Sequence, residues 1–320
     1  MTTRRILSLA AVALFSACGG HALLEDTSGR FRLVARVRAT DTAATRSALR
    51  EGIAAHSAAL LFATDSEAGA PTDGVGVPVV AIGTSSSSTT QPAVLVVERT
   101  GADVAVQLAL LACSGISIPK QLPLGAEVQR SVPDARPTNR PAPGDVVIEL
   151  LRQQHAAVLA IPPTTDVVFR IGFVHLDADD PWQLRVRADV EEAAHRYHQL
   201  ELTTRCANGD PAKHAAIVRE LAGNGCRAIL VGANDPAPAS SIADELREHS
   251  VALVVVARHV RESAATSCVG PDQVVLGTAA GEAAASLLPR GGAIIEVHGD
   301  PASPLLVPRR QGFAAALGLK

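Results

Sequence analysis

Polar and aromatic side chains follow several predicted strands of this sequence. Asp180 and Trp182 lie in the segment 177–183, directly after an apolar run. Arg258 follows a second apolar run, 251–257. Carboxylate and guanidinium groups make paired hydrogen bonds to neighbouring hydroxyls, and a flat aromatic ring covers the apolar face of a small ring. These residue types suit a small polar ligand that is held without covalent chemistry.

Each of these residues also has a purely structural interpretation. Asp180 precedes Pro181, which is a preferred first residue of a helix, so Asp180 suits an N-cap. Trp182 suits the core beneath its own loop, and an arginine after a strand is common on protein surfaces. The sequence leaves both interpretations open.

Catalytic patterns are absent from the sequence. It contains no GxSxG, HExxH, P-loop or GxGxxG motif. Glu192 and His195 form a Glu-x-x-His pair, but a helical two-metal site needs a second such set. We therefore predict a solvated helix face at this pair, no metal, no cofactor and no enzymatic activity.

Composition favours a layered α/β protein. The chain has 320 residues, of which 47% are hydrophobic. Its net charge of −3 lacks the strong positive excess that is typical of nucleic-acid-binding proteins. Aromatic residues make up 2% of the chain, so the core must consist of Val, Leu, Ile and Ala. Long aliphatic runs of this kind are typical of parallel strands that are buried on both faces.

Strands alternate with helices of ten to fifteen residues through most of the chain. This alternation predicts βαβ units and doubly wound parallel sheets, in which ligands bind outside the carboxyl ends of the strands. A Pro-rich linker and a helical pattern over 129–166 separate the two halves. Helices are predicted over 41–57, 185–198, 208–225 and 240–250, with strands over 31–39, 118–128, 167–176, 200–206, 227–233, 251–257 and 293–299.

The N-terminus reads as a targeting segment. A basic pair at Arg4 and Arg5 precedes the apolar run 6–15, which is too short to span a bilayer as a stable helix. Small residues then precede Cys18. This pattern resembles a bacterial lipoprotein signal, which implies a signal peptide over 1–18, lipidation of Cys18 and membrane contact through the lipid only. A plain secretory signal is the alternative, and both imply export to the periplasm or cell envelope.

Four further cysteines lie in the exported chain. Four cysteines allow three disulfide connectivities, and the sequence does not choose among them. Their spacing matches no zinc site. We expect most of them to be small buried apolar residues. The four are Cys113, Cys206, Cys226 and Cys268.

Six segments in order resemble a known family. The segments are FRIGFVHLDADDPW, DPAKHAAIVRELAGNGCRAILVGANDP, VALVVVARHV, CVGPDQVVLGTAAGEAAASLL, GGAIIEVHGDPASP and RRQGF. Over 167–320 they look like the first lobe and the start of the second lobe of type I periplasmic sugar-binding proteins, the ribose-binding-like group. The resemblance implies two Rossmann-like lobes joined by a hinge, with a small ligand, a sugar, clamped between them. It also implies delivery to an ABC permease or a sensor.

The first half of the chain is similar to the second lobe of the same family. This order implies a circular permutation, in which the body of the second lobe comes first. The domains expected are a permuted second lobe over 31–128, a linker and helix over 129–166, a first lobe over 167–302, and the start of the second lobe over 303–320, packing with 31–90. Two alternatives stay open: a repeated first lobe, or a fragment of a longer protein.

The resemblance also assigns binding residues. Its first lobe places ligand contacts at Asp180, Trp182 and Arg258, although Ala257 replaces the aspartate that often precedes this arginine in the family. Its R-x-x-GF signature places a contact at Arg309. In the permuted lobe it points to Asp65 and Arg99, while Gly83 stands where the family has an aspartate. An envelope protein with a degenerate site is therefore the alternative function.

Overall fold

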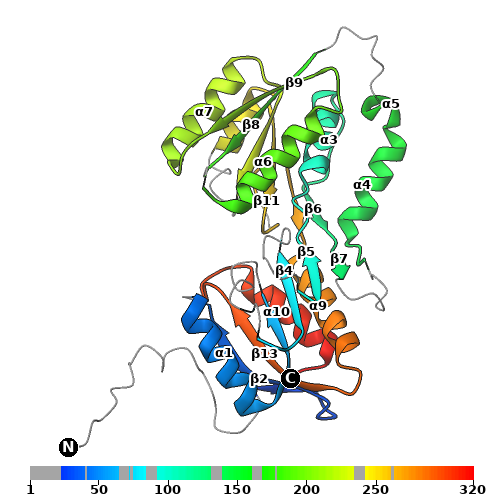
Figure 1. Cartoon of the computed structure of the whole chain (residues 1–320). Coiled ribbons are helices and arrows are strands. Elements are labelled where there is room, and N and C mark those ends of the chain that lie inside the picture. Colours follow the sequence, from blue (N-terminus) through cyan, green and yellow to red (C-terminus); the bar gives the residue numbers. More distant parts are fainter. Residues whose placement is uncertain are drawn as a thin grey trace, which may run out of the picture. The chain divides into compact units, whose positions relative to one another are not determined.

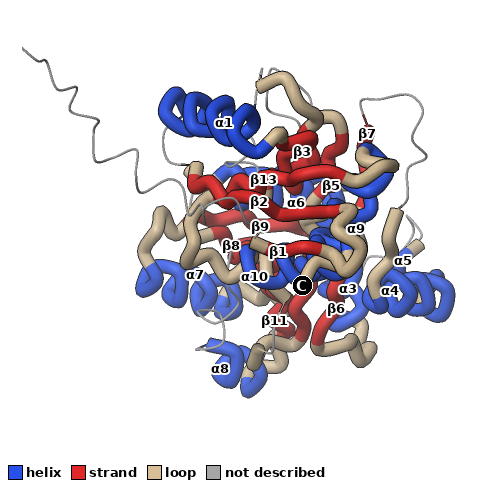
Figure 2. Tube along the Cα trace, turned by 90° about the horizontal axis from the view of Figure 1, so that it is seen from below, coloured by secondary structure: helices blue, strands red, loops and turns tan. Residues whose placement is uncertain are grey.

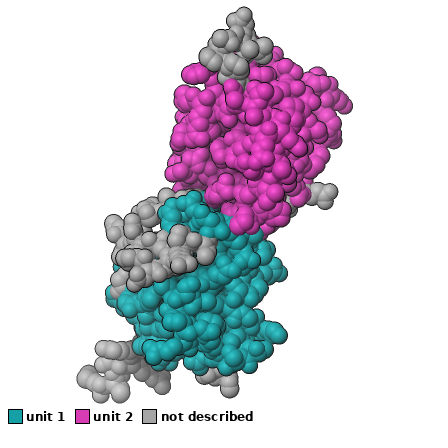
Figure 3. Space-filling view, turned by 90° about the vertical axis from the view of Figure 1, so that its right-hand side faces the viewer, with its two compact units in different colours: residues 1–98, 126–140, 273–320 teal, residues 99–125, 141–272 magenta. Residues whose placement is uncertain are grey.

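The computed structural model describes residues 23–39, 42–64, 72, 75–83, 92–130, 139–160, 168–176, 179–233, 242–260 and 263–320. These residues form two compact units (Figure 3). Unit 1 takes the described residues of 1–98, 126–140 and 273–320, and unit 2 takes those of 99–125 and 141–272. The chain therefore passes between the units at four connections: 98/99, 125/126, 140/141 and 272/273.

Unit 2 contains an entirely parallel sheet with helices on both faces (Figure 1). Its strand order is β6-β12-β11-β10-β8-β9, with bounds β6 Gln121–Leu124, β12 Ser267–Pro271, β11 Ala252–Ala257, β10 Ala228–Ala233, β8 Phe169–His175 and β9 Leu200–Cys206. One face packs against α3 (Ala102–Cys113) and α6 (Pro181–Ala194), and the other against α7 (Pro211–Gly223) and α8 (Ala243–Glu248). Helix α4 (Pro143–Gln154) packs beside β6 and is followed by α5 (Ala156–Leu159).

Unit 1 contains a second sheet whose five central strands are parallel. Its order is β1-β2-β13-β3-β4-β5-β7, with bounds β1 Leu24–Glu25, β2 Phe31–Arg38, β13 Gly292–His298, β3 Ala58–Ala63, β4 Val79–Gly83, β5 Val94–Val97 and β7 Glu127–Arg130. Helix α1 (Thr42–His56) covers one face, while α9 (Gln273–Leu287) and α10 (Leu306–Leu317) cover the other (Figure 2). The α/β fold class with parallel sheets is confirmed.

An aspartate followed by a proline begins two helices of unit 2, α6 and α7. Asp180 caps α6 by accepting hydrogen bonds from the backbone N–H groups of Trp182 and Gln183. Asp210 caps α7 in the same way, and a proline follows each cap. Helix α6 therefore starts at Pro181, four residues before the predicted start at Arg185, because the cap satisfies its first N–H groups.

The two sheets have the same strand order when β13 is treated as the first strand of unit 1 and β2 as the second. When β8, β9, β10, β11 and β12 of unit 2 are numbered 1 to 5 in chain order, their order across the sheet is 2-1-3-4-5. In unit 1 the same order appears when β13 and α10 precede β2. Leu319 forms a β-bridge with Asp26, close to the start of β2. The C-terminal strand and helix thus occupy the place of a first βα unit.

The unit boundaries differ from the predicted ones. Residues 99–125 belong to unit 2, because α3 buries Leu108 and Leu110 in the core of unit 2 and β6 pairs with β12. The segment 118–128 is not one edge strand, since β6 and β7 lie in different sheets. Residues 273–302 belong to unit 1, where α9 covers the sheet.

No disulfide joins the four cysteines that the structure describes. Cys113, Cys226 and Cys268 are buried, whereas Cys206 is half-buried. Burial raises the pKa of the Cys113 thiol to about 11 and also raises the pKa of Cys226. These two thiols are therefore packing residues rather than reactive groups. Among the described helices, none combines the length and the hydropathy needed to cross a bilayer.

Candidate functional site

The carboxyl edge of the unit 2 sheet gathers several predicted binding residues. The strand ends are aligned, because His175 is in register with both Cys206 and Gly232 and Ala233 is in register with Ala257. Helix α6 begins beyond β8, and Arg258 follows β11 at the same edge. Ligands of doubly wound proteins bind at this edge of the sheet.

Asp180 and Arg258 are brought to this edge from different strands. One strand, β10, lies between β8 and β11, so the strands that lead to the two residues are about 10 Å apart. Oδ1 of Asp180 accepts hydrogen bonds from Trp182 N at 2.8 Å and from Gln183 N at 3.1 Å. Asp180 is therefore the N-cap of α6, and it lies at the edge where a ligand is expected. Arg258 is half-buried, and its backbone N–H donates to Ala233 O at 3.3 Å.

Trp182 is a core residue, so the expectation that it covers a sugar ring is corrected. Its side chain is 2% exposed and belongs to the core of unit 2 together with Phe173, Val186 and Val190. The first turn of α6 turns the indole inward against the sheet. Its Nε1 donor is buried and has no hydrogen-bond partner among the described residues.

Arg309 is an internal structural residue, so its predicted ligand contact is also corrected. It is 1% exposed and forms a 2.9 Å ion pair with Glu98, which is fully buried. Its Nε donates to Gln273 Oε1 at 2.6 Å, and its Nη1 donates to Thr64 O at 2.5 Å. A buried charge is tolerated only when it is paired and hydrogen-bonded. The guanidinium group therefore serves the interior of unit 1.

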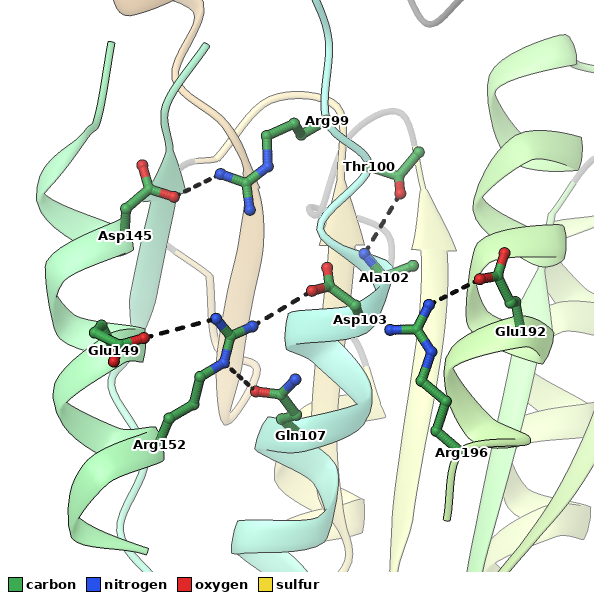
Figure 4. Close-up of polar contacts among 10 residues, drawn as sticks. All are labelled: Arg99, Thr100, Ala102, Asp103, Gln107, Asp145, Glu149, Arg152, Glu192 and Arg196. Atoms are coloured by element: carbon green, nitrogen blue, oxygen red, sulfur yellow. Dashed lines mark hydrogen bonds and ion pairs between the residues drawn. The ribbon is translucent and has the colours of Figure 1, made fainter. Parts of the chain in front are cut away.

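Arg99 belongs to unit 2 rather than to the lobe predicted for it. Its Nη1 donates to Asp145 Oδ1 at 2.6 Å, and α4 supplies the aspartate (Figure 4). The predicted ligand contact at Asp65 and the predicted lipidation at Cys18 lie outside the described residues. Of the five predicted ligand contacts that the structure describes, Asp180 and Arg258 lie at the carboxyl edge of the unit 2 sheet and are only half-buried.

Sequence reasoning missed two buried histidines at equivalent places. His175 ends β8 and is 1% exposed, and His298 ends β13 and is 9% exposed. Both strands occupy the first position of the 2-1-3-4-5 winding in their own sheets. The signal was a Val-His pair at the end of an aliphatic strand, since polar residues are rare in such strands. Each histidine lies at the carboxyl edge of its own sheet.

The Glu-x-x-His pair is part of a solvated surface. Glu192 accepts from Arg196 at 2.8 Å, and both side chains are exposed (Figure 4). The ring of His195 bonds to the backbone carbonyl of Glu191. Among the described residues, no group of three or more His, Cys, Asp or Glu could hold a metal ion.

Comparison with known proteins finds a family similarity over part of the chain. No curated protein matches the sequence. Residues 171–319 match the family model described as a periplasmic binding protein domain. The match begins in β8 and ends just after α10, so it runs from unit 2 into unit 1 without interruption.

Solved structures of solute-binding proteins also match. An ABC transporter solute-binding protein from Mycobacterium smegmatis, with bound glycerol, is 30% identical over 47% of this chain and 52% of that chain, with a TM-score of 0.39. A fructose-binding periplasmic domain of a hybrid two-component system is 29% identical over 47% and 49%, with a TM-score of 0.37. A Caulobacter myo-inositol-binding protein is 23% identical over 49% and 52%, with a TM-score of 0.38. The matched segment spans about half the length of each. Through residues 171–319, this chain is similar to the periplasmic binding protein domain family.

Proposed function

We propose that this protein is an exported binding protein that holds a small polar ligand, of the carbohydrate class, for ABC import or for sensing. The observation that carries the proposal is the family match over 171–319, which includes Asp180 and Arg258. The family implies a periplasmic location. Binding is non-covalent in this proposal, and the protein is not an enzyme.

The ligand contacts proposed for unit 2 are Asp180 and Arg258. The carboxylate accepts from ligand hydroxyls, and the planar guanidinium donates to a neighbouring pair of oxygens. Asp65 is proposed as a contact from unit 1, on the resemblance alone. Cys18 is proposed as the lipid attachment site, because small residues precede it after a short apolar run.

The domain order is proposed to be circularly permuted relative to the family. Two observations support this: the family match runs from unit 2 through α9, β13 and α10, and β13 takes the first place in the winding of unit 1. In that reading the chain after α10 continues at β2. Permutation is tolerated at exposed connections between elements.

A second candidate is an envelope protein whose binding site is degenerate. Three expected ligand contacts are engaged elsewhere in the structure: Trp182 in the core, Arg309 with Glu98, and Arg99 with Asp145. This loss of contacts favours a weakened site over one tuned to an ordinary monosaccharide.

A thermal-shift screen of residues 19–320 separates the two candidates. A panel of monosaccharides and polyols, including fructose, allose, myo-inositol and glycerol, is added to the purified protein. A ligand that binds the folded state raises the melting temperature by mass action. We expect one member to raise it, and we expect Asp180→Asn and Arg258→Gln to reduce that rise.

Arg196→Gln is the matched control, because Arg196 pairs with Glu192 on an exposed helix face. This variant should keep the ligand-induced rise. A protein that melts cooperatively and responds to no member of the panel would contradict the binding proposal and favour the degenerate site.

A further inference from the structure

Asp145, in the first turn of α4, accepts hydrogen bonds from the start of its own helix and from two segments that are remote in sequence. Its Oδ1 accepts from Arg99 Nη1 at 2.6 Å (Figure 4). Its Oδ2 accepts from the backbone N–H of Gly125 at 2.7 Å and from that of Ala142 at 2.8 Å. All four residues belong to unit 2.

Those three donors mark three of the four connections between the units. Arg99 follows the 98/99 connection, Gly125 precedes the 125/126 connection, and Ala142 lies just after the 140/141 connection. The fourth connection joins the same cluster, because the N–H of Asp272 donates to Leu124 O at 2.8 Å. Within unit 2, the ends of all four connections therefore gather at the end of β6.

The packing of α4 brings the carboxylate to this position. Gly144 lies against the backbone of β6, and a Cβ at this residue would approach Pro123 O to 2.3 Å. Only glycine allows the start of α4 to lie so close to β6. About two turns further along, Arg152 donates to Asp103 and Gln107 of α3 (Figure 4). The start of α4 is thus held against β6 and its end against α3.

The opposite ends of the connections are also held in pairs, inside unit 1. Ala126 and Arg140 exchange backbone hydrogen bonds of 2.8 and 3.0 Å. Arg309 bonds both Glu98 and Gln273, which end the remaining two connections. Each connection is therefore hydrogen-bonded at both of its ends to the ends of other connections, either directly or through Asp145 or Arg309.

We propose that Asp145 is a positioning residue that links three of the connections through hydrogen bonds, so that these three segments bend together. A charged acceptor makes stronger hydrogen bonds than a neutral one, and Asp145 is only 20% exposed. This goes beyond ligand binding and needs no ligand to be tested. Its failure is therefore distinct from a failure of the proposed function.

The competing explanation is that Asp145 merely caps α4. An acidic residue in the first turn stabilises a helix through the N-terminal N–H groups and the macrodipole. That role concerns Ala142 and its neighbours alone. It predicts no effect at Gly125, which is remote in sequence and lies after β6.

Residue-resolved hydrogen exchange of the full exported chain separates the two explanations. In Asp145→Ala we expect exchange at Gly125 and Ala142 to rise together, by roughly tenfold or more, because both lose the same charged acceptor. Arg99→Gln should leave both amides within about threefold of wild type, since Oδ2 keeps them. Glu149→Gln, on the next turn of α4, is the control and should change neither amide.

Faster exchange at Ala142 with no change at Gly125 would overturn the proposal and leave a simple helix cap. Protection in β10 and β11 reports whether unit 2 is still folded. If Asp145→Ala loses that protection, Asp145→Asn provides the test, because its amide keeps the volume and one accepting oxygen. In a folded Asn variant the two amides must still respond together, and an effect at one alone contradicts the proposal.

Discussion

At the residue scale, the structure converts a predicted ligand contact into a stability determinant. Arg309 is buried with Glu98, Gln273 and Thr64 O as its partners. The R-x-x-GF signature that suggested a ligand contact at Arg309 is also compatible with an internal ion pair. The two interpretations differ only in the direction in which the side chain points, which the sequence does not specify.

Arg309→Gln is expected to lower the free energy of unfolding by about 3–5 kcal/mol, because it removes the ion-pair partner of the buried Glu98. Urea unfolding followed by circular dichroism measures this change. Glu282→Gln in the same unit is the control, since its ion pair with Arg140 is exposed and should contribute about 1 kcal/mol or less. Equal effects of the two variants would show that the buried pair has no special role.

His214, on the buried face of α7, makes stability depend on pH. Burial lowers the pKa of its imidazole. The unfolded state therefore binds more protons than the folded state below the unfolded pKa of about 6.5, so stability should fall as the pH drops from about 7 to 5. His214→Gln should show a smaller fall in the urea midpoint over this range.

The exposed His195 is the matched control for this comparison. Its Gln variant should follow the wild-type pH profile. A His214→Gln profile that coincides with wild type at each pH would assign the acid sensitivity to other groups.

At the element scale, glycines allow α9 and α10 to pack with their backbones in contact. A Cβ at Gly312 would lie 2.1 Å from Val274 O and 2.6 Å from Thr278 N. The rings of Phe313 and Phe62 stack with their centroids 3.9 Å apart, which ties α10 to β3. The glycine-phenylalanine pair that resembled a family signature thus packs α10 onto the unit 1 sheet.

Gly312→Ala should destabilise the protein by about 1–3 kcal/mol, because neither backbone can move away without disturbing the core. The expected readout is a fall of several degrees in the melting temperature. Gly223→Ala is the control, since it ends α7 with open space around it and should be neutral or slightly stabilising. If Gly312→Ala melts with or above the control, the close approach of the two helices is wrong.

At the scale of the whole molecule, the proposed permutation can be reversed by rearranging the chain. Residues 168–320 are placed first and joined by a short flexible linker to residues 23–160. The N–H of Lys320 donates to Glu25 O at 3.1 Å, so the ends to be joined already lie side by side. We expect cooperative unfolding with a free energy within about 2 kcal/mol of the original, because only loop closure changes.

A variant with the same linker that is opened inside α3, between Leu108 and Ala109, is the control. It should not fold cooperatively, since both residues are fully buried in the core of unit 2. A rearranged chain that fails to fold as the control does would contradict the permuted order.

The sequence by itself determined the element types and the fold class. Aliphatic runs such as 251–257 form buried strands, and Asp180-Pro181 and Asp210-Pro211 begin helices, because these signals act over a few neighbouring residues. Only the tertiary structure decided which unit receives each element and which side chains face inward. Residues 118–128 divide between two sheets, and Trp182 and Arg309 turn into cores. Strand pairing, the packing of α3 and the pairing of buried charges depend on contacts between residues far apart in the chain.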